Sequence, residues 1–123
     1  MADEIKFTIE GEVTNGAYKE VLSRTRYEFD QDAIGDYSAV VSVGTSEEDL
    51  GVADVTVNGW LYLKNLDTTN YVTWGPKSAG AMVAMGRLEP GEFALFRMAP
   101  SSVTLRWVAN SAAVKVKAIL WQD

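Results

Sequence analysis

The sequence predicts an all-β fold, an antiparallel β-sandwich that is jelly-roll-like. Runs in which apolar and polar residues alternate recur along the chain, and turn residues separate them at the spacing typical of sandwiches and barrels. No segment keeps the period of an amphipathic helix. Because 123 residues are enough for a single two-layer core, one domain covering residues 1–123 is expected.

The first expected element is a hairpin at residues 4–23. Its first strand alternates between apolar and polar side chains, and Ile5 and Phe7 belong to the apolar face. The hairpin is long and amphipathic. We therefore expect it to project to a neighbouring subunit, where it would lie across the neighbour or add a strand to its sheet.

The dipeptide Asn15-Gly16 predicts the turn of this hairpin, because both central residues of a type I′ turn need a positive φ. With these two residues at the centre of the turn, Val13 pairs with Tyr18. The apolar pattern changes phase beyond this point, which predicts a β-bulge or a bend at residues 23–25.

Residues 37–43 alternate again and predict the next strand. Three aspartates at positions 30–36 surround a glycine, as in a calcium-binding loop, but Ile34 stands where a ligand is needed. We interpret this segment as an acidic surface turn and expect no metal. The acidic stretch at residues 44–51 is interpreted in the same way, as a solvated loop.

The stretch from Trp60 to Gly75 predicts a second hairpin. If Asn65 faces Asn70 across the loop, the apolar side chains of both strands fall on the same face. The outer face then carries the amphipathic residues Trp60, Tyr62, Lys64, Tyr71 and Thr73.

The sequence Glu89-Pro90-Gly91-Glu92 predicts a type II turn, because Pro90 fixes φ at the second position and Gly91 allows a positive φ at the third. Such a turn suits a tight hairpin poorly, so we expect the chain to pass from one sheet to the other at this corner. Strands are predicted after it at residues 93–98, 103–109 and 114–120. Lysines on the last strand are expected to protect an exposed sheet edge.

The composition argues against catalysis. The chain has no Cys and no His, so thiol chemistry, the commonest general base and the usual zinc ligands are all missing. The carboxylate pairs Glu89 with Glu92 and Glu47 with Asp49 lie in turns that are expected to be solvated, a poor setting for acid–base work. We predict no enzyme activity, no catalytic residue and no cofactor.

The charge and hydropathy patterns limit the kinds of partner that the chain can be expected to bind. A net charge of −6 argues against nucleic-acid binding, which depends on Lys and Arg neutralising phosphates. No apolar stretch is long enough to span a bilayer, and no secretory signal pattern is present at the start of the sequence. We expect no membrane contact and synthesis in a cytoplasm.

Three motifs in residues 60–123 resemble one known group of proteins. They are the loop NLDTTNYVTWG, the corner GRLEPGEFALFRMAP and the ending LRWVANSAAVKVKAILWQD. The group is the small structural proteins of tailed-bacteriophage virions. The resemblance implies a non-enzymatic capsid decoration or cement protein in the virion, made in the host cytoplasm. It also implies a homo-oligomer, with a trimer favoured, and other virion subunits such as the major capsid protein as partners. A tail or fibre position is the alternative location.

Large aromatic side chains on an outer face tend to mark contacts with protein or sugar, unless another part of the monomer covers them. One hypothesis is a subunit interface, and the alternative is a carbohydrate-binding module that stacks on surface glycans. We favour the interface, because few side chains near the aromatics could bind sugar hydroxyls. The predicted interface residues are Trp60, Tyr62, Lys64 and Tyr71, together with Ile5, Phe7 and Tyr18 of the hairpin.

Overall fold

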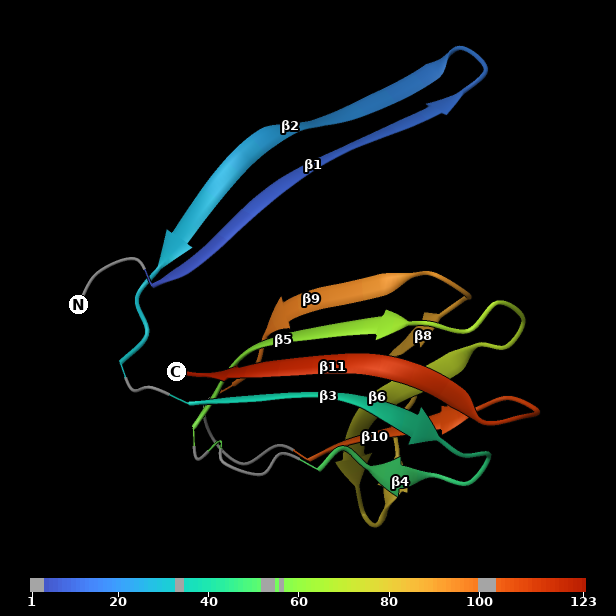
Figure 1. The fold of residues 1–123 in the computed structure, drawn as a ribbon. Coiled ribbons are helices and arrows are strands. Elements are labelled where there is room, and N and C mark those ends of the chain that lie inside the picture. Colours follow the sequence, from blue (N-terminus) through green and yellow to red (C-terminus); the bar gives the residue numbers. More distant parts are fainter. Residues whose placement is uncertain (1–3, 33–34, 52–54, 56, 100–103) are drawn as a thin grey trace. The chain divides into compact units, whose positions relative to one another are not determined.

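The computed structural model describes residues 4–32, 35–51, 55, 57–99 and 104–123. All regular secondary structure in these residues is β-strand, so the predicted all-β class is confirmed. The chain forms two compact units, Met1–Ala33 and Ile34–Asp123. The first unit is a long hairpin and the second is a two-sheet sandwich (Figure 1).

The hairpin pairs β1 (Ile5–Asn15) with β2 (Tyr18–Phe29), so it continues past the predicted end at residue 23. Asn15 pairs with Tyr18, and the predicted turn was therefore wrong by one residue. Gly16 has a φ of 59° and Asn15 has no positive φ. A positive φ at the first central residue alone is the type II′ pattern, which puts glycine first and leaves Asn15 in the strand.

The predicted bulge in the hairpin is confirmed. Ile9 pairs with Thr25 whereas Gly11 pairs with Leu22, so the second strand holds one more residue than the first between these two pairs. The extra residue falls at positions 23–24, where the apolar pattern changed phase. Because of this bulge, the apolar residues on both sides of it stay on one face of the hairpin.

The second unit contains a four-stranded sheet and a five-stranded sheet. The strands of the four-stranded sheet are, in spatial order, β3 (Asp36–Val43), β11 (Val114–Gln122), β5 (Asn58–Asn65) and β9 (Phe93–Arg97). The five-stranded sheet runs in the order β4 (Glu48–Asp49), β10 (Leu105–Ala109), β6 (Val72–Ser78) and β7 (Ala81–Met82), and β8 (Gly86–Leu88) also pairs with β6.

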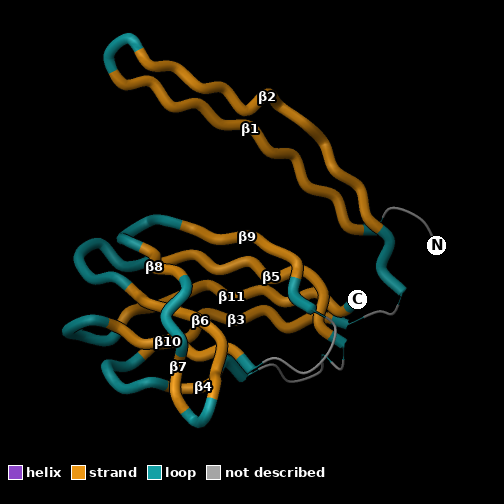
Figure 2. The backbone as a smooth tube through the Cα atoms, turned by 180° about the vertical axis from the view of Figure 1, so that it is seen from behind, coloured by secondary structure: helices purple, strands orange, loops and turns teal. Residues whose placement is uncertain are grey.

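In the second unit, most strands that follow one another in the sequence lie in opposite sheets (Figure 2). The exception in this unit is the step from β6 through β7 to β8, which stays within the five-stranded sheet. Every strand pair that the structure describes is antiparallel. This order is that of a jelly roll, in which two Greek keys build two facing sheets. The predicted jelly-roll-like sandwich is thus confirmed.

The predicted central hairpin is wrong. β5 pairs with β11 and β9, whereas β6 pairs with β10 and β8 in the other sheet. The segment between β5 and β6 therefore connects the two sheets. The face assignment was nevertheless correct, because Leu61 and Leu63 of β5 and Val72 and Trp74 of β6 are all buried. These side chains meet across the core from opposite sheets. Alternation alone does not show whether two strands share one face of a sheet or belong to two sheets that face each other.

The predicted corner between sheets is confirmed. β8 belongs to the five-stranded sheet and β9 to the four-stranded one, and the turn between them contains Pro90 and Gly91. Gly91 has a φ of 80°, and the backbone N–H of Glu92 donates to the carbonyl of Glu89 at 3.0 Å. These are the features of a type II turn.

The last strand is not an edge, so the predicted role of its lysines was wrong. β11 lies between β3 and β5. Residues from Val114 to Leu120 that point inward are fully buried, and Lys115 and Lys117 lie on the opposite, outer face. The lysines therefore mark the outer face of a central strand.

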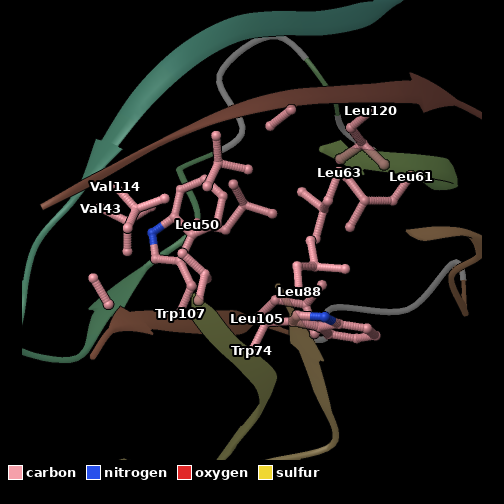
Figure 3. Close-up of a cluster of buried hydrophobic side chains, with 14 of the residues drawn as sticks. Val43, Leu50, Leu61, Leu63, Trp74, Leu88, Leu105, Trp107, Val114 and Leu120 are labelled. Atoms are coloured by element: carbon pink, nitrogen blue, oxygen red, sulfur yellow. The ribbon is translucent and has the colours of Figure 1, made fainter. Parts of the chain in front are cut away.

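The core fills the space between the two sheets (Figure 3). Its centre is made of aliphatic side chains that are at most 1% exposed, among them Leu61, Leu63 and Leu120. Each such side chain stabilises the fold by about 1.5–3 kcal/mol. Trp74 closes the core by stacking on Phe96, with ring centroids 5.0 Å apart and 6° between the planes. This core holds the four-stranded sheet in a fixed register, which positions the outer face described next.

Candidate functional site

The outer face of the four-stranded sheet gathers large apolar side chains from three neighbouring strands. The strand register places Ile119 beside Tyr62, and Tyr62 beside Leu95. Phe93 stacks on Tyr62 with ring centroids 6.2 Å apart. We call this surface the outer aromatic face. It consists of Trp60, Tyr62, Phe93, Leu95, Ile119 and Trp121.

Basic side chains lie next to the outer aromatic face. The register places Lys117 beside Lys64, and Lys64 beside Phe93. The Lys117 ammonium donates to the Ser38 hydroxyl at 3.0 Å. Within the described part of the chain, Lys64 makes no ion pair, although it lies among aromatic residues. The face is therefore apolar, and its margin beside Phe93 is positive.

The structure brings Trp60, Tyr62 and Lys64 together, as predicted, but it places Tyr71 elsewhere. Tyr71 immediately precedes β6 in the other sheet, and the Arg87 guanidinium lies 4.0 Å from the centroid of its ring. The prediction that these four residues share a face was wrong for Tyr71, because it depended on pairing β5 with β6.

The hairpin also has one apolar face. The register puts the odd-numbered residues of β1 on the same face as their partners in β2. Phe29 contacts both Phe7 and Tyr27, with ring centroids 6.4 and 6.3 Å apart. We call this surface the hairpin apolar face. It consists of Ile5, Phe7, Ile9, Val13, Tyr18, Leu22, Tyr27 and Phe29.

The opposite face of the hairpin is charged. The Lys19 ammonium lies 3.7 Å from the Glu12 carboxylate, and the Arg26 guanidinium lies 2.9 Å from that of Glu28. Exposed pairs of this kind stabilise a fold by less than about 1 kcal/mol each. They keep this side of the hairpin soluble, so contact with a partner is expected on the apolar side, which holds the predicted residues Ile5, Phe7 and Tyr18.

Sequence reasoning missed several residues of these surfaces. Ile119 and Trp121 alternate with buried residues of β11, and Phe93 and Leu95 alternate with partly buried residues of β9. That alternation identifies outward positions. Nothing in it shows that these strands flank Tyr62, because lateral strand order is set by contacts between residues far apart in the sequence.

The acidic stretch at residues 44–51 was predicted to be a simple solvated loop, and that prediction was wrong. Glu48 and Asp49 form β4, which pairs with β10. The Arg106 guanidinium donates to the carboxylates of Asp49 at 2.8 Å and Glu47 at 3.2 Å. The hydrogen bond from Arg106 lowers the pKa of Asp49. These acids hold a short strand in place, which is a structural role.

A cavity of about 430 Å³ lies at the corner between β8 and β9, lined by residues that include Arg87, Glu92 and Phe93. Its charged groups already have partners. Arg87 forms an ion pair with Glu89, and the Glu92 carboxylate accepts the backbone N–H of Glu89 at 2.8 Å. The cavity therefore offers a ligand few unsatisfied polar groups.

Asp67 shapes the connection between the two sheets. Its carboxylate accepts the backbone N–H groups of Asn70 at 2.6 Å and Thr69 at 3.0 Å. These hydrogen bonds, led by the one from Asn70, lower the pKa of Asp67 below its ordinary value of 3.8. Asp67 is thus held ionised as a structural acceptor.

The lowered pKa of Asp67 predicts part of the response of the fold to acid. A carboxyl group with a lower pKa in the folded state stabilises the fold above its unfolded pKa. That stabilisation is lost as the pH falls through the folded pKa. We expect the free energy of unfolding to decline below about pH 4, and to decline less in Asp67→Asn, whose side chain does not titrate.

Urea unfolding followed by tryptophan fluorescence at pH 6, 4 and 3 measures this effect. Asp32→Asn is the matched control, because Asp32 is an exposed acid with no side-chain interaction among the described residues. A control profile that parallels the wild type is expected. The assignment is wrong if Asp67→Asn loses as much stability between pH 6 and pH 3 as the wild type does.

Among the described residues, no group of three or more acidic side chains is arranged to hold a metal ion. The described residues also include no helix that is long and apolar enough to cross a membrane. Comparison with known proteins finds no matching family model, no similar curated protein and no similar solved structure. The resemblance to virion proteins and the interface residues stay predictions.

Proposed function

We propose that this chain is a non-enzymatic structural subunit of a bacteriophage virion, of the capsid decoration or cement kind. The observation that carries the proposal is the hairpin, a separate compact unit with one apolar face and one charged face. A two-stranded hairpin is at best marginally stable in water. It gains stability when another surface covers its apolar face, which is how a subunit clamps its neighbour.

The outer aromatic face supports the same function. Protein interfaces are enriched in aromatic residues at their centre and have polar rims. Trp60 and Tyr62 supply the first feature and Lys64 the second. An assembly that repeats such contacts by symmetry gains stability from buried area at many copies and needs no chemistry at any of them.

The fold and the resemblance provide further support. Jelly rolls form capsid proteins of viruses, although the same fold also hosts lectins and enzymes, so this support is an analogy. Residues 60–123 resemble virion structural proteins through their loop, corner and ending motifs. In this role the chain would be made in the host cytoplasm and would contact the major capsid protein or other copies of itself.

Carbohydrate binding is the second candidate, because the exposed ring of Phe93 beside Tyr62 resembles a stacking platform. A sugar site also needs Asn, Asp or Gln side chains that bind hydroxyl groups. The polar residues beside this face are Lys64, Lys117, Ser38, Arg97 and Asp36, and among them only Asp36 is of that kind. A partner that is apolar and acidic fits this surface better than a neutral sugar does.

The proposal is tested on intact particles of the phage whose genome carries this gene. Peptide mass spectrometry of particles purified through two density gradients should detect the chain at a fixed ratio to the major capsid protein. A lysate from uninfected host cells, purified in parallel, is the control. Absence from purified particles would overturn the proposal, and binding on a glycan array in that case would favour the sugar-binding candidate.

A further inference from the structure

We propose that the tip of the hairpin of one copy docks on the outer aromatic face of a second copy of this chain. The inference rests on the proposed function and names the partner. The hairpin tip is Val13, Tyr18, Glu20 and Leu22, which share one face according to the strand register. Each copy then donates its tip to one neighbour and accepts the tip of another.

The hairpin is longer than any strand of the four-stranded sheet. Its strands have 11 and 12 residues, whereas the longest strand of that sheet has 9. At about 3.3 Å per residue the hairpin is about 36 Å long and that strand is about 30 Å long. A two-stranded hairpin needs cover for its apolar face, and another molecule can supply it over the part that is exposed.

Exposure identifies the tip as that part. Val13, Tyr18 and Leu22 are 56%, 59% and 54% exposed, whereas Ile5 at the other end of β1 is buried. Three large apolar side chains, each more than half exposed on one small face, form a patch of the kind that marks a protein contact. The tip thus presents three apolar side chains around Glu20.

The outer aromatic face offers a matching apolar surface. Phe93 is 65% exposed and stacks on Tyr62, so a ring from another molecule can pack against this pair. Lys64 lies beside Phe93 in the register. Aromatic area and a lysine therefore lie side by side at the point where we place the tip.

Charge complementarity selects this face as the acceptor. Glu20 lies on the tip directly opposite Val13, and within the described residues it makes no ion pair. Lys64 likewise makes none among those residues. Docking the tip on the outer aromatic face would bring these two charges together in a partly desolvated setting, where an ion pair adds specificity.

Pairing of two hairpin tips with each other is less favourable. Apart from the residues at the bulge, the apolar side of the hairpin carries no Lys or Arg. Two tips packed face to face would therefore bring two Glu20 carboxylates into one apolar contact with no cation of their own. A tip on an outer aromatic face is a head-to-tail contact, which forms a ring when the rotation between copies closes.

Mixing two variants of the full chain tests this geometry. The tip variant carries Tyr18→Asp and Leu22→Asp, and the face variant carries Phe93→Asp. Each is expected to be monomeric by light scattering at concentrations where the wild type assembles. Because each retains the surface that the other has lost, an equimolar mixture should form a complex of two chains and nothing larger. A mixture that stays monomeric, or a face variant that assembles alone, overturns the proposal.

The tip variant could fail to assemble because its hairpin has unfolded, so an exchange of charges provides a second test. Glu20→Lys and Lys64→Glu should each weaken assembly at least tenfold, and the double variant should recover most of that loss. Glu10→Lys is the matched control, because Glu10 lies on the charged face of the same hairpin. Single variants that assemble like the wild type, or a double variant without recovery, overturn the Glu20–Lys64 contact.

This inference and the proposed function fail in different ways. A chain that is present in purified particles but shows neither complementation nor charge recovery is a virion subunit whose hairpin binds something else. A chain that passes both mixing tests but is absent from particles assembles as inferred and has another function. A wild type that is monomeric at every concentration overturns the docking on a second copy.

Discussion

Replacing Asn65 by alanine is expected to lower the free energy of unfolding by about 3–5 kcal/mol, because it leaves several backbone groups without a hydrogen bond. The Asn65 side chain is fully buried. Its amide N–H₂ donates to the carbonyls of Asn70 at 2.9 Å and Leu88 at 3.0 Å, and its Oδ1 accepts the backbone N–H of Asp67 at 2.8 Å. Alanine removes all three bonds.

The position of Asn65 makes this loss costly. Its own backbone N–H donates to the carbonyl of Glu92 at 2.9 Å, and its carbonyl accepts the N–H of Gly91 at 3.1 Å. One residue therefore joins the end of β5, the connection to β6, strand β8 and the corner before β9. The connection from β5 to β6 and the corner from β8 to β9, where the chain passes between the sheets, both depend on Asn65.

Urea unfolding at neutral pH measures the effect of Asn65→Ala. Asn110→Ala is the matched control, because the Asn110 side chain is exposed. The control is expected to change the free energy of unfolding by no more than about 0.5 kcal/mol. A loss of less than 1 kcal/mol in Asn65→Ala would show that the buried amide does not organise the two crossings.

Replacing Gly75 by alanine is expected to cost about 3 kcal/mol or more, which is at the upper end for overpacking. A Cβ atom at this position would lie 1.9 Å from the carbonyl oxygen of Val83 and 2.9 Å from the backbone N of Met85. Both obstacles are backbone atoms, so no side-chain rotation relieves the clash. The N–H groups of Val83 and Met85 donate to the carbonyls of Pro76 and Trp74 at 2.8 and 3.0 Å.

Those two hydrogen bonds hold the segment from Val83 to Met85 against β6. The segment can move away from a Cβ atom at position 75 only if they break. Thermal unfolding of Gly75→Ala should show a melting temperature lower by at least 10 °C. Gly44→Ala is the control, since a Cβ there meets no atom within 4 Å and the residue has no positive φ. Equal melting temperatures for the two variants would contradict the close approach at Gly75.

The inward residues of the sandwich could be predicted from the sequence, but their strand partners could not. Leu61 and Trp74 were correctly placed on the buried side by alternation. The same alternation arises whether two strands pair in one sheet or face each other across a core. The turn Pro90-Gly91 was different, because its required φ angles identified a corner and placed its two strands in different sheets.

For the candidate surfaces as well, residues on one strand could be predicted to share a face, but their neighbours on other strands could not. Trp60 and Tyr62 were correctly predicted to share a face, since they alternate along one strand. Tyr71 was wrongly added because it depended on the failed pairing. Phe93 and Ile119 became neighbours of Tyr62 only through the strand order, in which β11 lies between β3 and β5. Such long-range pairing is set by the topology of the whole sandwich, which no local pattern encodes.

The mass of the chain in solution shows whether it is an assembling structural subunit. Static light scattering of the purified full chain should be measured across micromolar concentrations. We expect a closed oligomer whose mass is a whole multiple of 13.5 kDa and that dissociates on dilution. A mass of 13.5 kDa at every concentration would contradict the claim that its exposed apolar faces bind other copies.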